Sequence, residues 1–295
     1  MSGRRHLVWT CIAVLAFAIA MVGASATANA ALTYVRNGPD HIAAGQLGSR
    51  RAPCPARMHV LGGGQFVSSA FGDAVLNAST PYDSKDLNQR PDDGWKSTVR
   101  NFNANNTLTV FAICSRRTPS YPGKTISVGP GRTAKTARRA CPRGRLVTGG
   151  GVQLHANFAD SGWIDSSAPF DSIDVNPRAD DGWRATGGVE ERKVHMTMHA
   201  ICTDLGRQRA RYVTAKASAL PMTSGEASAS CPGDTHVTGG GVDTDGVAFH
   251  PMTISSPFDD PTDPKPRPDD GWQGEFDNYS NSDTGVITTY AICLT

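Results

Sequence analysis

Residues 90–95 read RPDDGW, the same six letters return at 267–272, and RADDGW stands at 178–183. Paired aspartates followed by glycine are typical of a tight turn, because Asp bonds to nearby backbone amides and Gly adopts a positive φ. A Trp directly after such a turn would open the next strand with its ring against a sheet. The recurrence therefore predicts that one turn and one strand are built three times.

Each hexamer lies inside a longer repeated pattern. Every copy opens with Cys-Pro, carries a Val six residues after that Cys and a Gly triplet from the eighth, and closes with Ala-Ile-Cys. A Pro-aromatic-Asp segment stands between the Gly triplet and the hexamer. Self-similarity at a near-constant period indicates a repeat architecture. We expect the repeats to span residues 31–117, 118–207 and 208–295.

The cysteines follow the same repeat. The chain has seven, and six remain if Cys11 is removed with an export signal. An even number of cysteines in an exported chain is typical of a disulfide framework. One Cys near the start and one at the end of each repeat predict the pairs Cys54–Cys114, Cys141–Cys202 and Cys231–Cys293. Each such bridge would stabilise its repeat by about 4 kcal/mol in the chain-entropy model.

The local patterns are those of strands. Residues 108–114 (LTVFAIC), 196–202 (MTMHAIC) and 287–293 (ITTYAIC) alternate in character with the two-residue period of a strand. Gly triplets between β-branched residues indicate a bulge or the close approach of another backbone. We expect an all-β protein of three homologous, disulfide-stabilised antiparallel modules packed in tandem. The alternative arrangement is a pseudo-threefold β-prism.

The first thirty residues have the features of a secretory signal peptide. Arg4 and Arg5 precede the apolar run 7–22, and Ala28-Asn29-Ala30 is a small-x-small cleavage pattern. The run is shorter than the ~20 apolar residues of a membrane span. We expect a secreted chain cut after residue 30, with no later transmembrane segment.

The charge balance argues against a nucleic-acid partner. The chain carries 29 basic and 27 acidic residues, and loss of Arg4 and Arg5 makes the two numbers equal. Nucleic-acid binders usually show a basic excess or stripe. A polysaccharide or cell-wall surface is the partner that we expect, and the oligomeric state is left open.

The hexamers also offer candidate binding groups. An exposed Trp beside Asp and Arg would form a sugar-binding platform, and adjacent carboxylates suit Ca²⁺ or glycoside hydrolysis. The candidate ligand-binding residues are Arg90, Asp92, Asp93, Trp95, Arg178, Asp180, Asp181, Trp183, Arg267, Asp269, Asp270 and Trp272.

Recurrence favours a structural role for these residues. An enzyme needs one active site whose catalytic residues differ from the other copies, whereas here the copies are alike. We therefore expect no catalytic residue, no metal and no required cofactor, with Ca²⁺ kept as an alternative. The predicted function is non-catalytic adhesion to carbohydrate or to a cell-envelope surface. The alternatives are a purely structural envelope or matrix component and a secreted hydrolase that uses the Asp pairs.

The Cys-Pro opening, the Gly triplet, the Gly-Trp pair and the Ala-Ile-Cys ending resemble a recurring module of exported bacterial proteins, from about Cys54 to the end of the chain. That family has no assigned catalysis, so the resemblance implies an extracellular β-module and no binding residues. The triplicated Cys-Pro and Gly pattern also distantly resembles the β-prism of egg-membrane outer-layer proteins, whose repeats are shorter and differently ordered. That likeness supports only the alternative fold.

Overall fold

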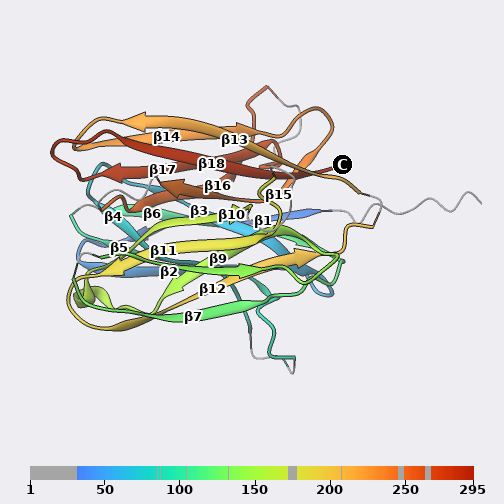
Figure 1. The fold of residues 1–295 in the computed structure, drawn as a ribbon, viewed down its shortest axis with the longest axis horizontal. Helices are drawn as coiled ribbons and strands as arrows, with labels where there is room; N and C mark the ends of the chain where they lie inside the picture. The colour runs from blue at the N-terminus through green and yellow to red at the C-terminus, as the bar shows by residue number, and fades with distance from the viewer. Residues whose placement is uncertain are drawn as a thin grey trace, which may run out of the picture.

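The fold is almost entirely β (Figure 1). The computed structural model describes residues 32–84, 86, 88–103, 105–131, 133–171, 178–206, 208–244, 249–262 and 267–295, so the expected signal peptide lies outside the described residues. The described part contains 18 strands and one short 3₁₀ turn, Phe158–Asp160. Among these residues, no helix has the length and apolar character needed to cross a bilayer.

The strands form three sheets of six antiparallel strands each. In spatial order, sheet A consists of β1 (Thr33–Ile42), β6 (Asn106–Ser115), β3 (His59–Ser68), β16 (Met252–Phe258), β17 (Gly271–Asn278) and β14 (Thr223–Ser230). Sheet B consists of β2 (Gln46–Pro53), β5 (Gly94–Asn101), β4 (Ala74–Tyr82), β9 (Leu146–Leu154), β12 (Val194–Thr203) and β7 (Gly123–Val128). Sheet C consists of β13 (Ala210–Ala219), β18 (Gly285–Leu294), β15 (His236–Thr244), β10 (Gly162–Phe170), β11 (Gly182–Val189) and β8 (Lys135–Ala140).

Every sheet is shared by two repeats. Sheet A joins three strands of the first repeat to three of the third, sheet B joins the first to the second, and sheet C joins the third to the second. We call the line where strands of two repeats pair a seam; the seam pairs are Gln65 with Ser255, Val152 with Ser79, and Val242 with Ser167. The predicted fold class, all-β with three disulfide-linked antiparallel modules, is confirmed. The modules interlock through shared sheets.

The first glycine of each triplet explains how the repeats close on one another. A Cβ built on Gly62 would lie 2.8 Å from the Cα of Gly239, one on Gly239 would lie 3.0 Å from that of Gly149, and one on Gly149 would lie 3.0 Å from that of Gly62. These contacts run in a ring through all three repeats, so we call the three residues the axis glycines. Only glycine permits this backbone approach.

The other two glycines of each triplet make room for the tryptophans. Trp95, Trp183 and Trp272 are fully buried, at 1 %, 0 % and 0 % exposure. Each indole lies against the middle glycine of its own triplet and reaches the last glycine of a neighbouring repeat. Each indole N–H donates to a serine Oγ beside the seam, at 2.9 Å in the first two repeats and 3.0 Å in the third. Each Trp therefore packs against residues of two repeats and stabilises the contact between them.

The Asp-Asp-Gly turn forms hydrogen bonds to the first residues of each repeat. In the first copy the Asp92 carbonyl accepts from the Val60 N–H at 3.0 Å, and the Asp93 carbonyl accepts from the Cys54 N–H at 2.8 Å. The second and third copies repeat both bonds. All three expected disulfides are present, with Cα–Cα distances of 5.6 to 5.7 Å. The hexamer thus fixes the opening Cys of each repeat relative to the strand that carries the Gly triplet.

Candidate binding surfaces

The tryptophans are not a sugar-binding platform, and this part of the sequence interpretation is wrong. Trp95, Trp183 and Trp272 have no exposed ring face, and each N–H is already bonded to a serine. The structural interpretation of the hexamer, a turn that registers a strand and buries its indole, agrees with these positions. A Trp after a turn has the same sequence pattern whether its ring points inward or outward. The pattern alone could therefore not distinguish a buried Trp from an exposed one.

The two carboxylates of each Asp pair point to different parts of the turn. The first members, Asp92, Asp180 and Asp269, are buried. Asp92 Oδ2 lies 2.8 Å from Nδ1 of His59, and Asp269 Oδ2 lies 3.1 Å from Nδ1 of His236. In the first and third copies the second members, Asp93 and Asp270, bond to their own loops.

The outward carboxylates hold neighbouring backbone. Asp93 accepts from the Ser84 N–H at 2.5 Å, and Asp270 accepts from the Asp260 N–H at 2.6 Å. In the first and third copies the two carboxylates of a pair therefore bind different groups, whereas hydrolysis by two carboxylates needs both at one position.

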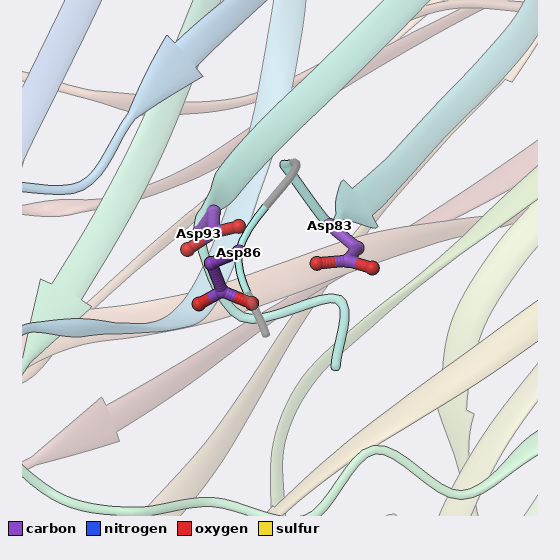
Figure 2. A group of neighbouring side chains, drawn as sticks. All are labelled: Asp83, Asp86 and Asp93. Carbon is purple, nitrogen blue, oxygen red and sulfur yellow. The ribbon is translucent and has the colours of Figure 1, made fainter. Parts of the chain in front are cut away.

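Among the described residues, one acidic cluster combines the second Asp of the first hexamer with two aspartates of the preceding loop. Carboxylate oxygens of Asp83, Asp86 and Asp93 lie within 4.8 Å of one another (Figure 2). Desolvation and the neighbouring carboxylates of Asp86 and Asp93 raise the pKa of Asp83. Such oxygens are the ligands that Ca²⁺ prefers. The Ca²⁺ alternative, expected at the Asp pairs, stays a prediction; Asp92 itself lies outside this cluster and beside His59.

Two hexamer arginines line cavities at the seams. On sheet A, Arg267 borders a groove of about 830 Å³. Its aromatic lining comes from Tyr34, Phe66 and Phe111 of the first repeat and Phe258 of the third. Its polar lining comes from Thr33, Arg36, Asp259, Arg267 and Gln273. We call this cavity the sheet A groove.

Sheet C carries a related groove at the corresponding place. This sheet C groove measures about 400 Å³ and has the aromatic lining Phe170, Tyr212 and Tyr290. Arg178 borders it, as Arg267 borders the sheet A groove. Arg184 also lines it and forms an ion pair with Asp243.

Sheet B differs at the same repeat positions. Tyr82 stands where the other sheets carry Phe258 and Phe170, and the Arg51 guanidinium covers its ring at 5.0 Å from the centroid. His199 replaces Phe111 and Tyr290 directly before the closing Ala-Ile-Cys. The third hexamer arginine, Arg90, is exposed.

A set of three tyrosines was missed by the sequence interpretation. The hydroxyls of Tyr34, Tyr121 and Tyr212 donate to the carbonyls of the repeat valines at 2.7, 2.8 and 2.9 Å. Each bond joins two different repeats, and burial raises the pKa of all three hydroxyls. The sequence contains a repeat pattern that could have identified these tyrosines, because a Tyr stands at nearly the same distance before each opening Cys.

The chain was also compared with known proteins. No family model matches it, and no curated protein matches it. The resemblance to exported bacterial modules therefore transfers no residue role, and the argument for function depends on the surfaces described above.

Proposed function

We propose that this protein is secreted and acts without catalysis, binding carbohydrate of a cell-envelope surface through the seam grooves. The observation that carries the proposal is the sheet A groove, in which four aromatic side chains lie beside arginine, aspartate and glutamine. Aromatic faces pack on the apolar faces of sugar rings, and polar groups at the rim accept and donate hydrogen bonds to hydroxyls. The three disulfides are consistent with an extracellular compartment.

The groove on sheet C gives the proposal a second site of the same type. Both grooves are bordered by a Pro-aromatic-Asp segment and by the hexamer arginine, Arg267 or Arg178. Two grooves on one rigid body would bind a polymer with repeated sugar units more strongly than either groove alone. This favours an insoluble or surface-bound polysaccharide as the partner.

The test is a pull-down of the purified protein with insoluble chitin, cellulose and peptidoglycan. The test variant combines Phe66→Gln with Arg267→Ala. Gln is the residue that the second repeat carries at the Phe66 position, as Gln153. We expect the variant to lose at least about tenfold in affinity, since buried aromatic and arginine contacts dominate binding energies.

Leu47→Gln is the matched control. Leu47 and Phe66 are equally exposed, at 37 % each, but Leu47 lies on β2 of sheet B. The control should bind as the wild type does, and circular dichroism should show all variants folded. Unchanged binding by the groove variant, or no binding of wild type to any of the three polymers, would overturn the proposal.

A further inference from the structure

The six strands of sheet B contain no Asp and no Glu, and all six are fully described. Sheet A differs sharply, since its strands carry Asp40, Glu226, Glu275 and Asp277. Like charges gathered on one sheet face create a local potential even when the net charge of the chain is near zero. Sheet B is therefore the one sheet whose strand residues offer no carboxylate to repel or compete with an anion.

Basic and imidazole groups occupy the outer face of sheet B. Met196 and Met198 of β12 are buried, so the residues that alternate with them, His195, Thr197 and His199, point outward. His155 lies beside them, because its N–H donates to the His195 carbonyl at 2.8 Å. The outward residues with basic or imidazole side chains are Arg51, Lys96, His155, His195 and His199. We call this surface the histidine face.

Hydroxyl groups lie between the charged groups of the histidine face. Thr197 Oγ1 lies 3.1 Å from Nε2 of His155 and 3.0 Å from Oγ1 of Thr125. Thr98 donates to the Ser49 Oγ at 3.1 Å on the other half of the sheet. Rows of hydroxyls and cations on one sheet face match a polymer that carries both hydroxyls and carboxylates.

Two histidines of the face, His155 and His199, have a lowered pKa, which favours their uncharged form. Burial, followed by the charges of His195 and Lys96, lowers the pKa of His155. Burial alone lowers the pKa of His199. Charged groups of both signs surround the face. The cations are Arg51 on β2, Lys124 on β7 and Lys135, whose Nζ donates to the Ser127 carbonyl at 3.2 Å. The carboxylates of Glu190 and Asp160 lie near buried Arg100 on β5. Protonation of the imidazoles would add positive charge beside Arg51 and Lys96.

We propose that the histidine face binds acidic polysaccharide, and that this binding strengthens as the pH falls below neutral. The surface is separate from the seam grooves of sheets A and C, so the proposal does not depend on carbohydrate binding there. A carboxylate-bearing polymer stays ionised at pH 5, and histidine is the side chain type that ordinarily gains a proton between neutral pH and that value. The protein would then hold such a polymer in acidic surroundings and release it near neutral pH.

The experiment measures binding of soluble polygalacturonate at about pH 5 and about pH 7.5, at one fixed low salt concentration. We expect wild type to bind at least about tenfold more tightly at the lower pH, with binding that weakens as salt is added. The double variant His155→Gln with His195→Gln should lose this pH dependence, since both side chains are exposed and their removal leaves the core unchanged. His41→Gln is the matched control, because His41 is exposed on β1 of sheet A and should keep the wild-type profile.

Two further variants complete the experiment. Lys96→Gln, which introduces the residue that the third repeat carries as Gln273, should weaken binding at both pH values. The groove variant Phe66→Gln with Arg267→Ala should keep the pH-dependent binding, which separates this proposal from the previous one. Equal wild-type binding at the two pH values, or a double variant with the wild-type profile, would overturn the inference. Equally tight binding of single-stranded DNA would also overturn it, since the face would then be a non-specific polyanion surface.

Discussion

The inner and outer surfaces of the three sheets have diverged to different degrees. Around the axis, the repeats use the same residues for the same contacts: the axis glycines, the buried indoles, the serines that accept from them and the cystines. On the outside, one repeat position holds Phe111 in sheet A, His199 in sheet B and Tyr290 in sheet C. Close packing leaves the interior no freedom, whereas the exterior can change without loss of the fold.

The largest effect is expected at the axis. Gly239→Ala would place a methyl group 3.0 Å from the Cα of Gly149 and against the Thr148 carbonyl, and backbone cannot move aside as a flexible side chain can. We expect loss of folding or a cost of at least about 3 kcal/mol in the free energy of unfolding. Gly129→Ala is the control, because a Cβ there meets nothing within 4 Å. Urea unfolding measures both, and a mild effect at Gly239 would mean that the repeats do not meet there.

The three buried Trp side chains should contribute equally to stability, because they occupy equivalent positions in the three repeats. Trp95→Ala, Trp183→Ala and Trp272→Ala each remove a fully buried ring and leave a serine without its donor. We expect each to cost about 3–5 kcal/mol, with similar values in all three copies. Thermal unfolding followed by circular dichroism gives the comparison. A much smaller loss of stability in one copy would contradict the structural equivalence of the three repeats.

On the outer surface, His199→Phe should change stability in a pH-dependent way. Burial lowers the pKa of His199, so the folded protein holds fewer protons there than the unfolded chain, and stability falls as the pH drops below the ordinary histidine value of 6.5. Phe, the residue of the first repeat, removes this penalty. We expect the variant to gain stability relative to wild type at about pH 5 compared with about pH 7.5. An equal difference at both pH values in urea unfolding would contradict this expectation.

Glu275 on sheet A should give an effect of the opposite sign. Burial raises the pKa of Glu275 from 4.5 to about 7, despite the hydrogen bond from Thr253. The folded protein therefore holds a proton that the unfolded chain has lost, and stability falls as the pH rises from about 4.5 to 7. Glu275→Thr introduces the residue of the other repeats, Thr98 and Thr186. We expect a flatter stability profile across that interval, and a profile that keeps its slope would assign the titration to another group.

The sequence was sufficient to predict the strands, the disulfides and the turn at each hexamer. Cys54 and Cys114 mark the ends of one repeat, and the alternation in residues 108–114 predicts a strand that β6 contains. It was not sufficient to choose between modules in tandem and interlocked sheets. That choice depends on short seam contacts such as Ser255 with Gln65, which leave no periodic signal.

The candidate sites were harder to predict for a related reason. The sheet A groove combines Phe66 of the first repeat with Phe258 of the third, so no spacing along the chain connects them. The histidine face is likewise assembled from β9 and β12 on one side and from β5 on the other. Repetition favoured Trp95 and its counterparts as candidate binding residues, whereas the proposed binding surfaces combine shared arginines such as Arg267 with residues that differ between the copies, such as Phe66 and His195. In this chain the buried shared residues build the fold, and the residues that differ between the copies vary the surface chemistry.

The most direct test of the interlocked architecture is a pair of engineered cross-links. Ala78 of the first repeat pairs with Gln153 of the second across the seam of sheet B, so Ala78→Cys with Gln153→Cys should oxidise to a disulfide between repeats. Ala78→Cys with Phe66→Cys is the companion, because Phe66 holds the Gln153 position within the first repeat itself but lies on sheet A. Peptide mapping under non-reducing conditions should find the 78–153 link and no 66–78 link. The reverse result would show that each repeat closes on itself and would contradict the shared sheets.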